Sequence, residues 1–185
     1  IQEGSIAIDG INTHDFTLES LRRHIGYVQQ DVFIFWGTIA ENIAYGNPEA
    51  TDEEIIEAAK RAQAHDFIME LPEGYDTLLG ERGMGLSGGQ KQRISIARAL
   101  CVDPKILILD DATSAVDMET EVKIQEGLKK TSEQKTTIII ANRISSVKNA
   151  DIILILSKGQ IVERGNHEEL LAKGGAYYQI YEEQL

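Results

Sequence analysis

The chain contains a single cysteine, Cys101, among its 185 residues. One cysteine excludes an internal disulfide framework and fits a reducing compartment, and its simplest interpretation is a small buried side chain on a helix. Long apolar stretches are missing too. The longest runs, such as "ILIL" and "IILIL", have the length of a strand, whereas a membrane-spanning helix needs about 20 apolar residues. The sequence therefore predicts neither a disulfide-rich domain nor a membrane span.

Basic residues are also few, with 18 Lys and Arg against 30 Asp and Glu, which gives a net charge of −12. Because nucleic acid binding depends on Lys and Arg that neutralise phosphates, this balance argues against a nucleic acid partner. The sequence has no Gly-Lys pair, so it contains no phosphate-binding loop of the form G-x-x-x-x-G-K-[ST]. The chain starts at Ile1 and not at Met, and we expect it to be part of a longer protein.

The composition that is present is that of a globular domain, 42% hydrophobic and 26% charged. Apolar strands alternate with helices, which predicts a parallel α/β sheet covered on both faces. The expected strands are residues 5–9, 25–30, 105–110, 136–141, 151–156 and 159–165. The expected helices outside the middle of the chain are residues 17–24, 116–130, a short one after 142, 167–173 and 176–185.

The middle of the chain, from Val32 to Ala99, is predicted to be mainly helical. One helix begins at Thr51, which forms a capping box with Glu54, and Pro72 stops the segment that follows it. Another helix follows "LSGGQ", with Ile94, Ala97 and Leu100 on one apolar face.

Polar side chains follow three of the predicted strands. Gln29 ends the strand "IGYV", Asp110 and Asp111 end "ILIL", and Asn142 follows "TIIIA". If these strands are neighbours, the side chains converge at the carboxyl edge of the sheet, where α/β proteins bind ligands. A carboxylate at a strand end is a hard oxygen ligand for Mg²⁺, and a second acidic residue can orient an attacking water. The plainer alternative is that a strand must end in something polar.

The stretch "LSGGQ" predicts a helix N-terminus. Ser87 can cap the helix, while Gly88 and Gly89 leave its first amides bare. Such unsatisfied N–H groups and the helix dipole favour an anion. The alternative is an ordinary glycine-rich turn before a helix.

Two other patterns give little evidence of a functional site. Gly83, Gly85 and Gly88 spell G-x-G-x-x-G, but the dinucleotide fingerprint requires a preceding strand, and "GYDTLLGERG" is a poor candidate for one. The histidines, His14, His24, His65 and His167, show no ligand spacing.

In combination, these motifs resemble the nucleotide-binding domain of an ABC transporter. The resemblance lies in "LSGGQKQRISIARAL", then "ILILDDATSAVD", then "TTIIIANR", with "YVQQD" similar to the Q-loop. The segments "VFIFWGTIAENIAYG", "GERGMGLSGG" and "GNHEELLAKGGAYYQIYEEQL" resemble the exporter branch. The resemblance covers essentially the whole chain.

The resemblance implies an α/β fold of the RecA-like P-loop NTPase type with an inserted helical lobe that carries the ABC signature. The N-terminal part of the core would be missing. Residues 1–31 would be a partial α/β lobe without the phosphate loop, residues 32–98 the helical lobe, and residues 99–185 the α/β lobe with Walker B, D-loop and switch region. The protein would work with a transmembrane domain at the cytoplasmic face of the cell membrane, and would pair with a second nucleotide-binding domain.

The resemblance also assigns residues to ATP and Mg²⁺. Gln29 would reach the metal and the nucleotide, and Asp110 would be the Walker B metal ligand. Asp117 would be the D-loop aspartate. The signature residues Ser87, Gly88, Gly89 and Gln90 would contact the ATP that the partner domain holds.

Three departures from the family pattern bear on catalysis. The phosphate loop is absent, Asp111 stands where the family has Glu, and Asn142 stands where it has its switch histidine. Asp111 is one methylene shorter as a water-orienting base, and Asn142 cannot become a cation. Because the signature is intact, we expect a hydrolysis-impaired half-site that lends its signature to a heterodimer partner.

The alternatives are a slow homodimeric ABC ATPase and a non-hydrolytic regulatory ATP-binding module. The 185-residue chain alone should hydrolyse nothing. The transported substrate cannot be read from these residues.

Overall fold

The structure is a computed structural model that describes residues 3–129 and 135–184. It divides the chain into two compact units, Ile1–Ile138 and Ile139–Leu185. None of the helices in the described ranges combines the length and the apolar character needed to cross a membrane.

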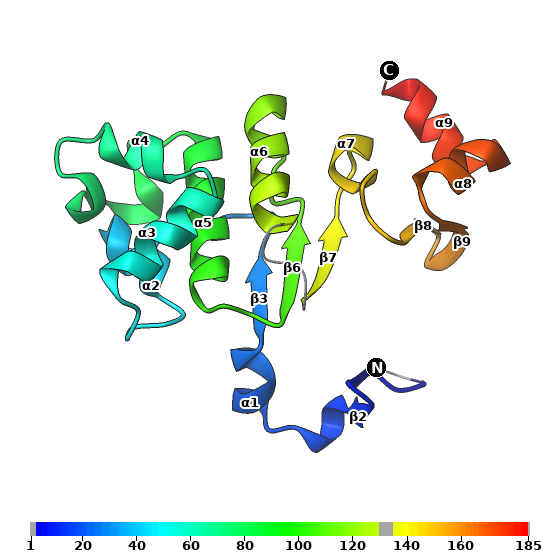
Figure 1. Ribbon diagram of the computed structural model, residues 1–185, viewed down its shortest axis with the longest axis horizontal. Coiled ribbons are helices and arrows are strands. Elements are labelled where there is room, and N and C mark those ends of the chain that lie inside the picture. The colour runs from blue at the N-terminus through cyan, green and yellow to red at the C-terminus, as the bar shows by residue number, and fades with distance from the viewer. Residues whose placement is uncertain (1–2, 130–134, 185) are drawn as a thin grey trace. The chain divides into compact units, whose positions relative to one another are not determined.

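The sheet that organises the first unit has the strand order β3 (Ile25–Val28), β6 (Ile106–Asp110), β7 (Thr136–Ile140) (Figure 1). β3 and β6 are parallel, with Ile25 opposite Ile106 and Val28 opposite Leu109. Gly26 lets the chain pass close to α5, because a Cβ at this position would meet the Ala99 carbonyl oxygen at 2.8 Å. The three strands predicted to end in polar residues are therefore neighbours, which is the condition for their polar ends to converge at one edge of the sheet.

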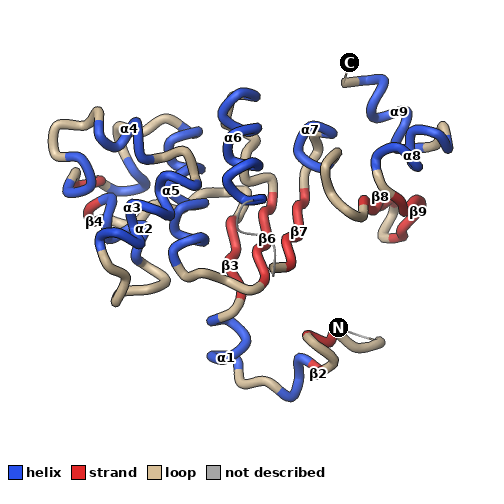
Figure 2. The backbone as a smooth tube through the Cα atoms, viewed as in Figure 1, coloured by secondary structure: helices blue, strands red, loops and turns tan. Residues whose placement is uncertain are grey.

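Helices dominate the chain between β3 and β6 (Figure 2). The α-helices of the first unit are α1 (Leu18–Arg23), α2 (Ile39–Ala44), α3 (Asp52–Arg61), α4 (His65–Met69), α5 (Gly88–Cys101) and α6 (Met118–Lys129). Short 3-10 helices are η1 (Thr13–Asp15), η2 (Gly74–Asp76) and η3 (Glu81–Gly83). Two antiparallel pairs complete the unit: β1 (Ala7–Ile8) with β2 (Ile11–Asn12), and β4 (Gly37–Thr38) with β5 (Leu78–Leu79).

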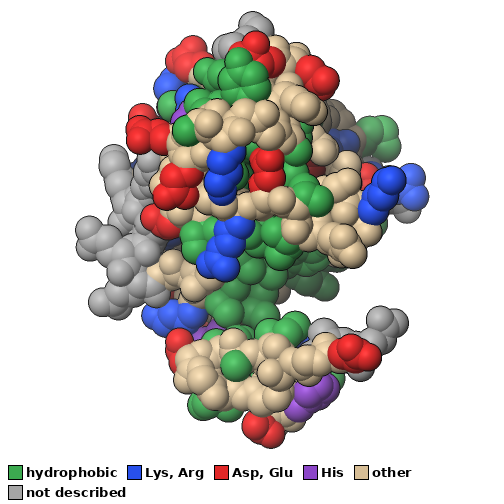
Figure 3. Space-filling view, turned by 90° about the vertical axis from the view of Figure 1, so that its right-hand side faces the viewer, with side chains coloured by type: hydrophobic (Ala, Val, Ile, Leu, Met, Phe, Trp, Pro, Cys, Tyr) green, Lys and Arg blue, Asp and Glu red, His purple; other side chains and the backbone are tan. Residues whose placement is uncertain are grey.

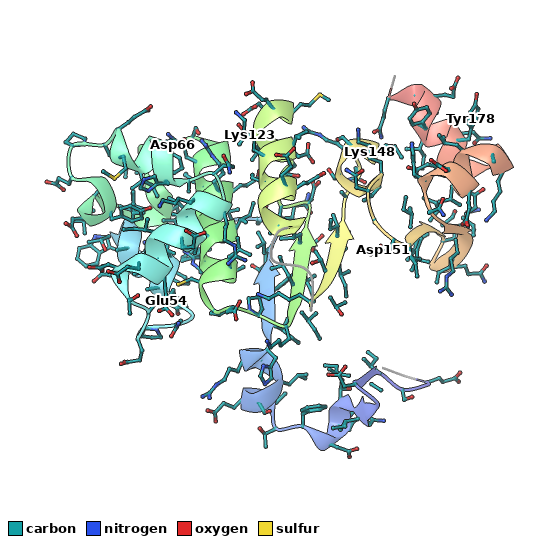
Figure 4. All side chains as sticks on the ribbon, viewed as in Figure 1. Glu54, Asp66, Lys123, Lys148, Asp151 and Tyr178 are labelled. Carbon is teal, nitrogen blue, oxygen red and sulfur yellow. The ribbon has the colours of Figure 1, made fainter. Side chains whose placement is uncertain are left out.

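The start of α3 follows from two residues that the sequence singled out. The Glu54 amide donates to Thr51 Oγ1 at 3.3 Å, and the Thr51 amide donates to a Glu54 carboxylate oxygen at 2.9 Å. Figure 4 labels Glu54. This reciprocal pair satisfies two amides that would otherwise lack partners, so the predicted capping box is confirmed.

The core of the first unit lies around α5, which packs against α2, α3 and β3. Its predicted apolar face is buried, with Ile94 and Ala97 fully enclosed and Leu100 4% exposed. Cys101, at the end of the same helix, is buried and free, as expected. α6 approaches α3 closely, because a Cβ on Gly127 would lie 2.7 Å from the Arg61 carbonyl oxygen.

The second unit differs from the expected continuation of a parallel sheet. It contains α7 (Ile144–Val147), β8 (Ile153–Ser157), β9 (Gln160–Gly165), α8 (His167–Lys173) and α9 (Ala176–Glu183). β8 and β9 form an antiparallel hairpin in which Ser157 pairs with Gln160. Lys158 and Gly159, the two residues between them, both have positive φ, 49° and 77°. Two residues can close a hairpin but cannot make the crossover that parallel strands need.

Side chains from α7, β8, α8 and α9 form a small core of the second unit. Ile144, Ile153, Leu170 and Tyr177 are buried together. The Tyr177 hydroxyl and His167 Nδ1 share a hydrogen bond of 2.7 Å. Apolar side chains of the hairpin remain exposed, among them Leu154, Leu156, Ile161 and Val162. Figure 3 shows hydrophobic side chains, in green, open to solvent on the side of the molecule that it presents.

Several predicted boundaries shift. The first strand is shorter than residues 5–9, because the chain turns at Asp9 and Gly10, both with positive φ, into the β1–β2 hairpin. α6 begins at Met118 and not at Val116, because Asp117 caps it. The predicted end of that helix, Lys130, lies outside the described residues.

Candidate functional site

Asp110 is the last residue of β6 and lies half-buried at the carboxyl edge of the sheet. The Tyr27 hydroxyl, on β3, donates a hydrogen bond to Asp110 Oδ2 at 3.1 Å. That hydrogen bond raises the pKa of Tyr27 above its ordinary value, with smaller contributions from burial and from the charge of Asp110. The phenol therefore keeps its proton at neutral pH and holds one carboxylate oxygen of Asp110 in place.

Gln29 follows β3 directly and is exposed. Val28 pairs with Leu109, so Gln29, directly after β3, and Asp110, the last residue of β6, come next along the two chains. The structure thus brings these two predicted metal ligands to one edge. No group of three or more His, Cys, Asp or Glu side chains in residues 3–129 and 135–184 could by itself hold a metal ion.

Asp111 begins the loop that leaves β6, and its φ of 47° lies in the left-handed region. Asp and Asn tolerate this conformation better than other residues with a side chain. The Asp111 carbonyl accepts from the Ser114 amide at 3.2 Å, so the chain turns at once toward α6. The second carboxylate is therefore carried by a turn, whereas Asp110 is carried by the strand.

Ser87 caps α5, as predicted. The Gln90 amide donates to Ser87 Oγ at 3.3 Å, and the Ser87 amide donates to Gln90 Oε1 at 2.8 Å. No hydrogen bond in the described part of the chain uses the backbone amide of Gly88 or Gly89. The Gln90 side-chain oxygen is thus engaged with its own helix, while the first amides of the helix stay available.

The two signature glycines also have a packing role that the sequence did not indicate. A Cβ on Gly88 would lie 3.3 Å from the Ala115 Cβ, and a Cβ on Gly89 would lie 2.9 Å from the Ala115 carbonyl oxygen. The loop after β6 therefore lies directly against the start of α5. Both are parts of the first unit.

Asp117 lies at the end of that loop and is exposed. Its Oδ1 accepts from the Thr120 amide at 2.9 Å, and its carbonyl accepts from the Glu121 amide at 2.9 Å. The hydrogen bond from the Thr120 backbone lowers the pKa of the Asp117 carboxyl below its usual value. Asp117 is therefore the ionised N-cap of α6.

Asn142 belongs to the second unit and is exposed. Its carbonyl accepts from Gln184 Nε2 at 2.8 Å, and Gln184 Oε1 accepts from the Ile144 amide at 2.9 Å. The last turn of the chain thus fixes the backbone around Asn142. The predicted convergence of Asn142 with Asp111 stays a prediction.

Tyr27 and Gln92 are the site residues that the sequence reasoning missed. Gln92, buried on α5, is hydrogen-bonded to Ser114 and Ala115 in the loop after β6. For Tyr27 a signal existed: it lies two residues before Gln29, the spacing that places side chains on the same face of an extended chain. Gln92 carried no such signal, because its partners lie on a distant loop.

Comparisons with known proteins bear on the family and the fold. The family model described as "ABC transporter" matches residues 1–114. An uncharacterised ABC transporter ATP-binding protein, YknU, of Bacillus subtilis is 63% identical over 179 residues, which are 97% of this chain and 31% of that protein. A putative multidrug export ATP-binding/permease protein of Staphylococcus aureus is 57% identical over 181 residues, 98% of this chain and 31% of that protein.

A solved structure of a bacterial Atm1-family ABC exporter with ATP bound superposes with a TM-score of 0.94 at 45% identity, over 99% of this chain and 32% of that chain. The chain spans about a third of the length of these proteins. The predicted fold class, a P-loop NTPase core of the α/β type present in part, is confirmed. The chain therefore belongs to the ABC transporter family and has the fold of an exporter's nucleotide-binding domain.

Proposed function

We propose that this chain is the ATP-binding part of an ABC exporter at the cytoplasmic face of a membrane. In the assembled protein it couples ATP binding and hydrolysis to the export of a substrate through a membrane-spanning part. The relatives support this proposal, since one is named as an export ATP-binding/permease protein. The chain itself contains no G-x-x-x-x-G-K-[ST] loop, so the isolated 185 residues should hydrolyse no ATP.

Asp110 and Gln29 are the proposed ligands for Mg²⁺. Their oxygen atoms are donors of the kind that Mg²⁺ prefers, and one carboxylate and one amide suit an ion that keeps several waters. Asp110 Oδ2 is held by Tyr27, which leaves the other carboxylate oxygen for the ion or its water. When bound at Asp110 and Gln29, Mg²⁺ would supply positive charge that offsets the negative charge of the ATP phosphates.

The start of α5 is the proposed contact with the partner's ATP. The helix runs from Gly88 to Cys101, and the amides of Gly88 and Gly89 lie at its positive end. The capping box keeps Ser87 and Gln90 in a fixed geometry around these amides. This surface would bind the γ-phosphate of a nucleotide held by a second nucleotide-binding domain.

One observation supports a hydrolysis-impaired half-site: an ordered signature helix start occurs in the same chain as Asp111. Asp111 has the charge for orienting water but one methylene less than Glu. A misplacement of about 1 Å can cost on the order of 10²-fold in rate. Asn142 can donate a hydrogen bond to the γ-phosphate but cannot become a cation. We propose that the chain, within the full-length protein, binds ATP at a half-site that is impaired in hydrolysis, and that it supplies an intact signature to a different partner chain.

Substitution of Ser87→Arg in the assembled full-length transporter tests this function. The new side chain places bulk and charge at the start of α5, so ATP turnover at the partner's site should be abolished. Ser20→Arg, at an exposed position of α1, is the control and should keep the parent rate. Unchanged turnover in Ser87→Arg would show that α5 does not contact a partner's nucleotide.

The same preparation separates the alternatives. A transporter that contains only one kind of chain and hydrolyses ATP at both sites is the slow homodimer. A protein that binds ATP but shows no turnover with any partner is the regulatory module.

A further inference from the structure

Gln92 is a buried amide on α5 that the proposed function leaves without a role. Its side chain is 4% exposed. Nε2 donates to Ser114 Oγ at 2.9 Å, and Oε1 accepts from the Ala115 amide at 2.9 Å. One side chain thus donates to one residue and accepts from the next in the loop after β6.

Packing at the same place shows how closely the loop is held. Ala115 lies against Gly88 and Gly89, where added Cβ atoms would come within 3.3 Å and 2.9 Å of it. On the other side, Thr113 Oγ1 donates to Glu121 Oε1 at 2.9 Å, which ties the loop to α6. The loop therefore lies between α5 and α6, and Gln92 makes its polar contact with α5.

We propose that Gln92 is a positioning residue that joins the Asp117 loop to the signature start of α5. Through it, Ser87 and Asp117 reach the partner's nucleotide as one rigid surface. This inference rests on the proposed function, because the surface has a ligand only if a nucleotide binds between two chains. Gln92 itself touches no reacting atom.

The chemistry of the amide suits this role. The Ala115 amide donates to the buried side chain of Gln92, and a hydrogen bond of this kind is worth about 0.5–1.5 kcal/mol. Gln accepts from this amide and also donates to Ser114. Glu would keep the acceptor for Ala115 and could accept from the Ser114 hydroxyl. Met fills a similar volume but offers neither group.

The first test is kinetic and uses the full-length transporter with the substitution in this chain alone. For Gln92→Met we expect kcat at the partner's site to fall about 10- to 100-fold, because a misplaced surface acts on the reacting geometry. The KM for ATP should change less than about 3-fold, because the partner's own phosphate loop still binds the nucleotide. Gln92→Glu should recover a large part of the loss. Gln179→Met, the same change at an exposed position of α9, should keep the parent kcat.

The second test measures the position of the loop directly. Spin labels at Met84→Cys and Met118→Cys, both on exposed side chains, report the distance between the segment before Ser87 and the residue after Asp117. Cys101 is buried and should not react with the label. The distance distribution should be narrow with Gln92 present and broaden in Gln92→Met.

The two tests separate the inference from the function on which it rests. If Ser87→Arg abolishes turnover while Gln92→Met keeps both the parent kcat and the narrow distribution, the positioning role is wrong and the function stands. If Ser87→Arg leaves turnover intact, the proposed function fails and the inference fails with it. A lowered yield of folded protein with unchanged kcat per folded molecule would reduce Gln92 to a residue of the core.

Discussion

Tyr27 and Asp110 meet at the carboxyl edge of the β3–β6 pair, where the phenol donates a 3.1 Å hydrogen bond to the carboxylate. The pKa of Tyr27 is raised by this bond. The phenol is therefore protonated at neutral pH, and the hydrogen bond is lost only as pH rises through the raised pKa. At neutral pH the proposed metal ligand has a fixed orientation before any ion binds.

Tyr27→Phe should lower the affinity for the Mg²⁺ that supports nucleotide binding at this chain's own site. The ring still packs, but Asp110 loses the donor that orients it. We expect the Mg²⁺ concentration for half-maximal nucleotide binding to rise about 3- to 10-fold, which corresponds to the net worth of about 0.5–1.5 kcal/mol of a typical single hydrogen bond. Titration of the assembled transporter with Mg²⁺ at fixed nucleotide measures this. Tyr75→Phe, which removes a hydroxyl bonded to His65, is the matched control, and equal shifts in both variants would contradict the role of Tyr27.

Asp111→Glu and Asn142→His should restore hydrolysis at this half-site only together. The measurement is ATP turnover of a full-length heterodimer whose other Walker B site is disabled. Each single change leaves one part of the site defective, so the double change should exceed the product of the single effects, by up to about 10²-fold. Asp31→Glu, at an exposed position, controls for the added methylene. If Asp111→Glu alone gave full activity, Asn142 would be harmless.

The φ of Asp111, 47°, lies in the left-handed region, which affects the stability of the Asp111→Glu variant. Glu adopts this conformation less readily than Asp. A small loss of thermal stability in Asp111→Glu is therefore expected, and turnover should be calculated per folded molecule.

Arg98→Lys should destabilise the first unit. The Arg98 guanidinium donates to the Phe33 carbonyl, the Asn42 carbonyl and Asn42 Oδ1 at 2.8–2.9 Å, and it stacks over the Phe35 ring. Burial lowers its pKa to about 10, so it remains a cation at neutral pH. Lys cannot reproduce the planar fork. We expect the free energy of unfolding to fall by about 2 kcal/mol.

Urea denaturation followed by circular dichroism checks this loss. Arg23→Lys is the control, since Arg23 forms an exposed ion pair with Glu19 on α1. That change should stay within about 0.5 kcal/mol of the parent. A similar effect at both positions would mean that the Arg98 network does not hold the segment after β3.

Alkaline pH should destabilise the protein partly through Tyr75. Burial, and secondly the charge of Asp66, raise the pKa of Tyr75 to about 12 from 10.0. The unfolded phenol loses its proton first, so the contribution of Tyr75 is complete below pH 10 and is lost as pH rises toward about 12. The melting temperature of Tyr75→Phe should therefore fall less steeply than that of the parent over this window. Parallel curves would contradict the shift.

The sequence predicted best those features that depend on neighbours along the chain. The capping box at Thr51, the Ser87 cap of α5 and the apolar face of α5 needed only local spacing. The β8–β9 hairpin was missed because its apolar strands look like those of a parallel sheet, although Lys158-Gly159 between them is short enough to have revealed it. The roles of Tyr27 and Gln92 depend on partners far along the chain, as does the packing of Ala115 on the signature glycines. No local pattern contains that information.

Gly127 shows how the contact between α6 and α3 limits protein engineering. A glycine inside a helix costs about 1 kcal/mol relative to alanine, so Gly127→Ala would be an obvious choice for a more thermostable variant. The Arg61 carbonyl lies 2.7 Å from where the new methyl carbon would be, and a backbone atom cannot turn aside as a side chain can. The substitution would force the two helices apart, and the stabilisation expected from alanine would be lost. Gly127 is therefore the spacer that sets how near α6 can lie to the end of α3, and stabilising changes belong on the solvent face of α6.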